Sequence, residues 1–117
     1  MTAPHRFQIK RVYEPATPSD GSRVLVDRLW PRGVRKEDAR IDLWLKDVAP
    51  SAALRSWFGH EPQRWPEFKR RYYHELRDRS DGVRRLQAMA ESSRVTLVYS
   101  AHDEEHNQAR ALADYLN

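Results

Sequence analysis

Two short runs, the first apolar and the second rich in strand-forming residues, constrain the fold of this chain more than any other feature of its sequence. They occupy residues 24–26 and 95–99, and both are followed by polar, turn-forming segments. A strand that is apolar at every position is typical of a parallel sheet covered on both faces. The second run precedes a helical stripe at the spacing of one helix face, formed by Ala109, Leu112, Ala113 and Leu116. The sequence therefore predicts an α/β fold: a small, open, mostly parallel sheet with helices packed on it.

Local signals predict the elements between these two strands. Residues 7–10 alternate apolar and polar, which predicts a half-exposed strand at a sheet edge. Ser51 and Gly59 are suited to cap the two ends of a short helix between them. Residues 41–49 fit either a short strand or a turn of helix.

A longer helical pattern follows the short helix. Pro66 fits the first turn, and one stripe contains Phe68, Tyr72 and Leu76. We expect residues 81–82, an Asp-Gly pair, to interrupt or bend this pattern before a second apolar face continues it.

Length and cysteine content limit the organisation and the chemistry. The 117 residues predict one domain over residues 1–117. The absence of cysteine excludes disulfides, thiolate metal sites and cysteine nucleophiles, and it fits a reducing compartment. The N-terminal residues lack the apolar run of a signal peptide, and no stretch is long enough to span a bilayer. We therefore expect a cytoplasmic protein without membrane attachment.

Positive charge is concentrated in the first half of the chain. The sequence has 21 Lys and Arg against 17 Asp and Glu, a formal net charge of +4. That excess is too small to predict nucleic-acid binding by itself. Arginine greatly outnumbers lysine, and its planar guanidinium group suits phosphate and carboxylate.

The first candidate site follows the apolar run at residues 24–26. Arg28 comes directly after that strand, and Arg32 lies in a turn constrained by the neighbouring Pro31 and Gly33. Two guanidinium groups held by a fixed backbone would form an anion clamp, with Trp30 and Gly33 as part of the site. The alternative is that Arg28 pairs with an acidic residue and that Trp30 belongs to the core.

The second candidate site is the loop after the strand at residues 95–99. Tyr99, Ser100, His102 and Asp103 lie at or beyond the strand end and before the last helix. Backbone N–H groups at the start of that helix would bind an anion, with the Ser100 hydroxyl as an added donor. The alternative is that Ser100 or Asp103 simply caps the helix. A nucleophilic Ser100 is less favoured, because no third group to orient a base is visible in the sequence.

Residues 102–106 match the pattern H-x-x-E-H, but we expect no metal there. Histidines four residues apart on one helix face can share a metal ion. The 11 residues after His106 leave no room for a downstream ligand helix, and acidic residues at a helix start favour the helix dipole without any metal. No cofactor is expected either.

The sequence also resembles a known family, the YeaO-like bacterial proteins, a group classed as a domain of unknown function. The most specific match is residues 23–33, which read R-V-L-V-D-R-L-W-P-R-G, and residues 10–15 and 96–101 also resemble the family. The resemblance spans nearly the whole chain. It implies no catalytic role, but it strengthens the expectation that Arg28, Trp30, Arg32 and Gly33 share a site with Tyr99 and Ser100.

We expect from these features a protein that binds a small phosphate or carboxylate ligand at the carboxyl ends of two neighbouring strands. Whether a reaction follows stays open, as do the oligomeric state and the identity of the ligand. One alternative is a nucleic-acid-binding module that uses the basic first half and four tryptophans, with Arg55 and Arg64 near them. Another is a protein-interaction domain without a ligand.

Overall fold

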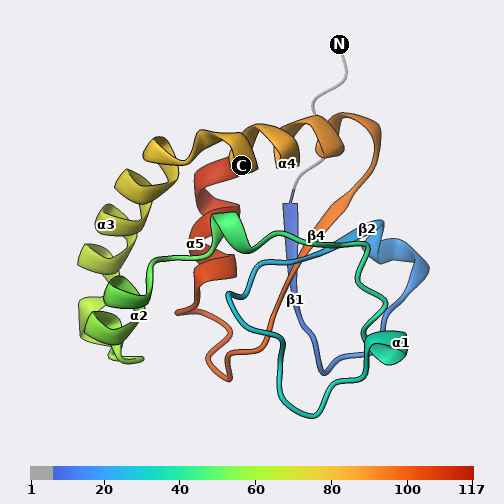
Figure 1. Cartoon of the computed structure of the whole chain (residues 1–117), viewed down its shortest axis with the longest axis horizontal. Coiled ribbons are helices and arrows are strands. Elements are labelled where there is room, and N and C mark those ends of the chain that lie inside the picture. The colour runs from blue at the N-terminus through green and yellow to red at the C-terminus, as the bar shows by residue number, and fades with distance from the viewer. Residues whose placement is uncertain (1–6) are drawn as a thin grey trace.

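The computed structural model describes residues 7–117. Four strands form one parallel sheet in the order β1-β4-β2-β3 (Figure 1). They are β1 (Phe7–Arg11), β2 (Ser22–Leu25), β3 (Leu43–Trp44) and β4 (Val95–Tyr99). The predicted α/β class with a small parallel sheet is confirmed. The half-exposed strand β1 lies at an edge, and the fully buried β4 lies inside the sheet.

Within residues 7–117 five α-helices accompany the sheet. They are α1 (Lys36–Ala39), α2 (Ala52–Phe58), α3 (Trp65–Asp78), α4 (Ser80–Ser92) and α5 (Gln108–Leu116). Figure 1 shows α3 and α4 following one another along the outside of the molecule, with α5 beside β1 and β4. No helix within residues 7–117 has both the length and the apolar character needed to cross a membrane.

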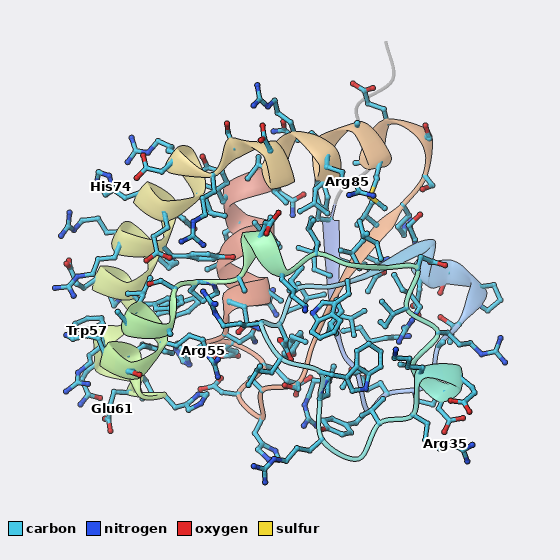
Figure 2. All side chains as sticks on the ribbon, viewed as in Figure 1. Arg35, Arg55, Trp57, Glu61, His74 and Arg85 are labelled. Carbon is cyan, nitrogen blue, oxygen red and sulfur yellow. The ribbon has the colours of Figure 1, made fainter. Side chains whose placement is uncertain are left out.

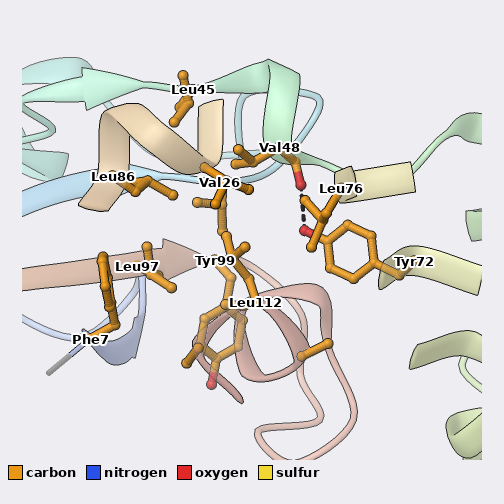
Figure 3. Close-up of a cluster of buried hydrophobic side chains, with 14 of the residues drawn as sticks. Phe7, Val26, Leu45, Val48, Tyr72, Leu76, Leu86, Leu97, Tyr99 and Leu112 are labelled. Carbon is orange, nitrogen blue, oxygen red and sulfur yellow. Dashed lines mark hydrogen bonds between the residues drawn. The ribbon is translucent and has the colours of Figure 1, made fainter. Parts of the chain in front are cut away.

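The two faces of the sheet bury different side chains. On the helix side, alternate residues of the inner strands pack against α3, α4 and α5, and Figure 3 shows Val26, Leu97 and Tyr99 in this cluster. On the opposite side, Leu25 and Val98 pack with Ala39 of α1 in a smaller cluster. Because both faces are covered, the inner strands are apolar at consecutive positions.

The predicted caps of the short helix are confirmed. The Ser51 hydroxyl accepts a hydrogen bond from the backbone N–H of Leu54 at the start of α2. Gly59 ends the helix in the left-handed conformation, with φ of 52°. In the ambiguous segment 41–49 both readings occur, because β3 is followed by a single 3-10 turn at Lys46–Val48.

The predicted interruption at residues 81–82 is wrong, because the chain breaks at Arg79 instead. Helix α3 ends at Asp78 and α4 begins at Ser80, so Gly82 lies within the first turn of α4. A β-carbon at Gly82 would approach Cγ1 of Val48 to 2.6 Å. Glycine is therefore needed there for close packing of α4 on the 3-10 turn, not for a bend in the chain.

A crevice forms where the chain leaves the two inner strands in opposite directions. After β2 the chain continues to α1 on the side of the smaller cluster, whereas after β4 it continues to α5 on the helix side. Neighbouring parallel strands with this divergence form a topological switch point, and ligands of open α/β sheets bind there, beyond the carboxyl ends of the strands.

Candidate functional site

The crevice at the carboxyl ends of β2 and β4 contains two adjoining cavities. We name them the arginine compartment, of about 330 Å³, and the aromatic compartment, of about 290 Å³. Both volumes are near the lower end for small-molecule sites. The residues that line both cavities are Pro50, Arg55, His60, Ala101 and Gln108. The two compartments are therefore parts of one cleft.

Three arginines line the arginine compartment. Arg28 comes from the segment after β2, Arg32 from the following turn, and Arg55 from α2. Arg55 is an exposed residue of α2, labelled in Figure 2. Among the described residues none of the three forms a salt bridge, and the buried Nε atom of Arg28 has no hydrogen-bond partner. The predicted alternative, in which an acidic residue pairs with Arg28, is absent from this structure within residues 7–117.

Aromatic side chains fix the backbone that carries Arg28 and Arg32. The indole N–H of Trp44 donates to the Asp27 carbonyl at 2.8 Å, and that of Trp30 donates to the Val34 carbonyl at 2.7 Å. The Tyr13 hydroxyl donates to the Arg32 carbonyl at 3.2 Å. The segment between β2 and α1 is thus held at its beginning, middle and end, although it contains no regular secondary structure. Such preorganisation lowers the entropic cost of binding a ligand.

A buried carboxylate, Asp27, lies beside the arginines. The Ser100 hydroxyl donates to Oδ2 of Asp27 at 2.6 Å, and the side-chain amide of Gln108 donates to Oδ1. Burial raises the pKa of Asp27, against the lowering effect of these hydrogen bonds and of the Arg55 charge. Since the single hydroxyl hydrogen of Ser100 is directed at Asp27, Ser100 offers a ligand its lone pairs while Asp27 is ionised.

The segment between β4 and α5 is organised by Asp103 and Asn107. One oxygen of Asp103 accepts the backbone N–H groups of Glu105 and His106, and the other lies 2.9 Å from Nδ1 of His106. These hydrogen bonds, first among them that from the Glu105 backbone, lower the pKa of Asp103. Asn107, buried, caps α5 by accepting from the Arg110 N–H. The prediction that Ser100 or Asp103 caps the last helix is therefore wrong.

The H-x-x-E-H pattern has no helical geometry here. Residues 102–106 precede α5, which begins at Gln108, so His102 and His106 do not share a helix face. The described part of the chain contains no group of three side chains suited to hold a metal ion.

The structure brings together some of the eight predicted site residues. Arg28, Trp30, Arg32 and Ser100 line the arginine compartment, whereas Gly33, Tyr99, His102 and Asp103 line neither compartment. Tyr99 is buried in the main core, and its pKa is raised chiefly by burial. Trp30 also packs edge-on against Trp44 beside the smaller core cluster.

Sequence reasoning missed several residues that line the cleft: Arg55, His60, His106 and Gln108. They come from α2, the residues just after it, and the start of α5, so only the packing of these helices brings them to the strand ends. For Gln108 the sequence contains one signal: it stands at the start of the last helix, just after a strand and its loop. The sequence around Arg55 indicates only the nucleic-acid alternative, through the neighbouring tryptophans, and not an anion site.

Comparison with known proteins identifies the family. A family model described as the inactive DUF488-N3 subclade matches residues 6–117. The uncharacterized protein Rv3073c of Mycobacterium tuberculosis is 45% identical over 117 residues, which cover 100% of this chain and 98% of that protein. The uncharacterized protein YeaO of Escherichia coli is 45% identical over 110 residues, which cover 94% of this chain and 96% of YeaO. No solved structure matches the chain. The chain thus belongs to the YeaO-like DUF488 family, within the subclade described as inactive.

Proposed function

We propose that this protein binds a small anion, a phosphate or carboxylate group, in the arginine compartment. The observation that carries the proposal is that Arg28, Arg32 and Arg55 line one cavity without an ion-pair partner among residues 7–117. An anion between them would make the charge-assisted hydrogen bonds that they otherwise lack.

The buried Nε of Arg28 shows that no group within residues 7–117 pairs with this part of the guanidinium. An anion in the cavity would bind the outer Nη atoms, and a hydrogen bond to a charged group contributes about 1.5–3 kcal/mol. The location supports the same function, because the cavity lies at the topological switch point, where ligands of open α/β sheets bind.

We propose binding without turnover. The sequence contains no cysteine, and the Ser100 hydroxyl is paired with Asp27, not with a histidine. The description of the subclade as inactive supports a binding role.

The tryptophans give little support to the nucleic-acid alternative. The charged groups of Arg71 and Lys46 lie 4.3 Å and 4.0 Å from the rings of Trp57 and Trp44. Rings covered in this way offer less surface for base stacking. A gel-shift series over salt concentration tests this alternative, and binding at about 50 mM salt that falls steeply with added salt would favour it.

Calorimetric titration with inorganic phosphate and with acetate tests the proposed function. Arg28→Gln should weaken binding of the better anion by about tenfold, because a hydrogen bond to a charged group contributes about 1.5–3 kcal/mol. Arg85→Gln is the matched control: it removes the same charge from an exposed position on α4, outside both compartments (Figure 2). If neither anion binds, or if both variants weaken binding equally, the proposal is contradicted.

A further inference from the structure

The aromatic compartment adjoins the proposed anion site and differs from it in chemistry. Its walls include the rings of Phe58 and Phe68, whose centroids lie 4.5 Å apart, and the small apolar side chains of Pro50 and Ala101. Both phenylalanines are almost fully buried, so they form the rigid inner wall. The phenylalanine rings favour a flat group, which would lie beside the polar side chains that also line this cavity.

Two histidines add hydrogen-bonding capacity to the same compartment. The ring of His106 is held by Asp103 through Nδ1 and meets the Trp65 ring edge-on at 5.4 Å. Nε2 is therefore its remaining polar atom. His60 has a positive φ of 57°, which is uncommon for a residue with a β-carbon, and it lines both compartments.

The boundary between the compartments places charge next to the aromatic walls. Arg55, His60 and Gln108 line both cavities, so a ligand whose anionic group meets the arginines has the aromatic compartment directly beside it. From this juxtaposition, and resting on the proposed function, we infer that the ligand is an organic anion that carries a planar ring. Its phosphate or carboxylate group would lie among the arginines, and its ring would lie against Phe58, Phe68 and His106.

Two probes that differ by a ring test this inference: phenyl phosphate and methyl phosphate. Calorimetric titration should give a dissociation constant about tenfold lower for phenyl phosphate, because stacking of a ring on aromatic side chains strengthens binding. Equal affinity for the two probes would overturn the inference and leave the anion site standing. If neither probe binds, the proposed function fails as well.

A substitution on α2 tests where the ring lies. Ala52 is exposed and lines the aromatic compartment, so Ala52→Tyr should fill it without disturbing the core. The preference for phenyl phosphate should fall to about twofold or less, while the affinity for methyl phosphate is retained. Ala53→Tyr is the matched control, because Ala53 is also exposed on α2 but lines neither compartment. If Ala52→Tyr retains the full preference, or Ala53→Tyr loses it equally, the ring does not bind in this compartment and the inference is overturned.

Discussion

Two buried aspartates, Asp20 and Asp27, respond to their surroundings in opposite ways. Burial raises the pKa of Asp20, but hydrogen bonds from Lys10, Thr17 and Arg23 outweigh burial and lower it to about 2. At Asp27 burial dominates and the pKa rises. Asp20 therefore stabilises the fold above its unfolded pKa of 3.8, and this contribution is lost as the pH falls toward 2. The contribution of Asp27 changes in the other direction, because the folded state holds its proton more tightly and loses that advantage as the pH rises above 3.8.

Substitution of Asp20 should alter the acid limb of the stability curve. The lowered pKa corresponds to about 2 kcal/mol of stability that is present at neutral pH and lost in acid. In Asp20→Asn the free energy of unfolding should be lower at neutral pH and should change less as the pH falls from 3.8 to about 2. Urea unfolding at a series of pH values measures this. If the free energy of unfolding of Asp20→Asn falls as steeply in acid as that of the unmodified protein, groups other than Asp20 cause the fall.

Arg23 and Arg28 differ in how far their guanidinium groups are hydrogen-bonded within the protein. Arg23 is buried and satisfied, since it donates to Asp20 at 2.7 Å and to the Ala39 carbonyl at 2.8 Å. Arg28 carries a buried Nε without a partner within residues 7–117. Methionine keeps much of the apolar stem and removes the charge in both cases.

We therefore expect Arg28→Met to change the free energy of unfolding by less than about 1 kcal/mol. Arg23→Met should destabilise the protein by about 3 kcal/mol, because it leaves the buried Asp20 without one of its partners. Thermal and urea unfolding of both variants measure the difference. Equal destabilisation would mean that Arg28 is a structural residue, against the role proposed for it.

At the scale of elements, one glycine turn precedes β2 and another follows it. Gly21 and Gly33 both have positive φ, of 65° and 72°. They differ in space: a β-carbon at Gly21 would lie 2.2 Å from the Arg94 carbonyl oxygen, whereas at Gly33 no atom lies within 4 Å. Gly21 thus serves both the turn and the close approach of the chain before β4, and Gly33 serves the turn alone.

Alanine at the two positions should separate these effects. Gly33→Ala adds only the cost of positive φ and should destabilise the protein by about 1 kcal/mol. Gly21→Ala must also displace backbone, and should destabilise it by about 3 kcal/mol or prevent folding. Urea unfolding compares the two. Equal costs would show that the Arg94 segment moves aside readily.

Elements were predictable where the deciding interactions are local. The caps Ser51 and Gly59 stand directly at the two ends of α2, so the sequence pattern contains the whole interaction. The prediction that Gly82 interrupts the helix was wrong because the glycine serves close packing on Val48, which is remote in sequence. The start of α5 was predicted too early, since both Asp103 and Asn107 are good caps and only the folded loop assigns Asp103 to the preceding turn.

At the scale of the whole molecule, topology brings the candidate site together. Residues after a strand are recognisable in sequence, so the positions of Arg28 and Ser100 at strand ends were predictable. Their adjacency depends on the pairing of β2 with β4, which are separated in the chain by four α-helices and strand β3. Arg55 enters from α2 through packing alone, and no local pattern at Arg55 contains that information.

The position of the cleft also explains how the protein combines a stable core with an unsatisfied site. The clusters on both faces of the sheet bury most of the apolar side chains, and the main cluster reaches the cleft through Phe58 and Phe68. The arginines lie beyond those ends, where the chain diverges toward opposite faces. Loss of a guanidinium group there should affect ligand binding more than folding, which is the pattern typical of a functional site.

The most direct test of the account is the Nε–H resonance of Arg28 during an NMR titration with inorganic phosphate. The resonance is assigned by its absence in Arg28→Lys, and the Nε–H of Arg85 on α4 serves as the internal reference. Anion binding in the cleft should give a saturable shift for Arg28, whose Nε lacks a partner among the described residues, and no saturable shift for Arg85. An Arg28 resonance that stays in place, or arginine resonances that all drift together without saturation, would contradict an anion site in this cleft.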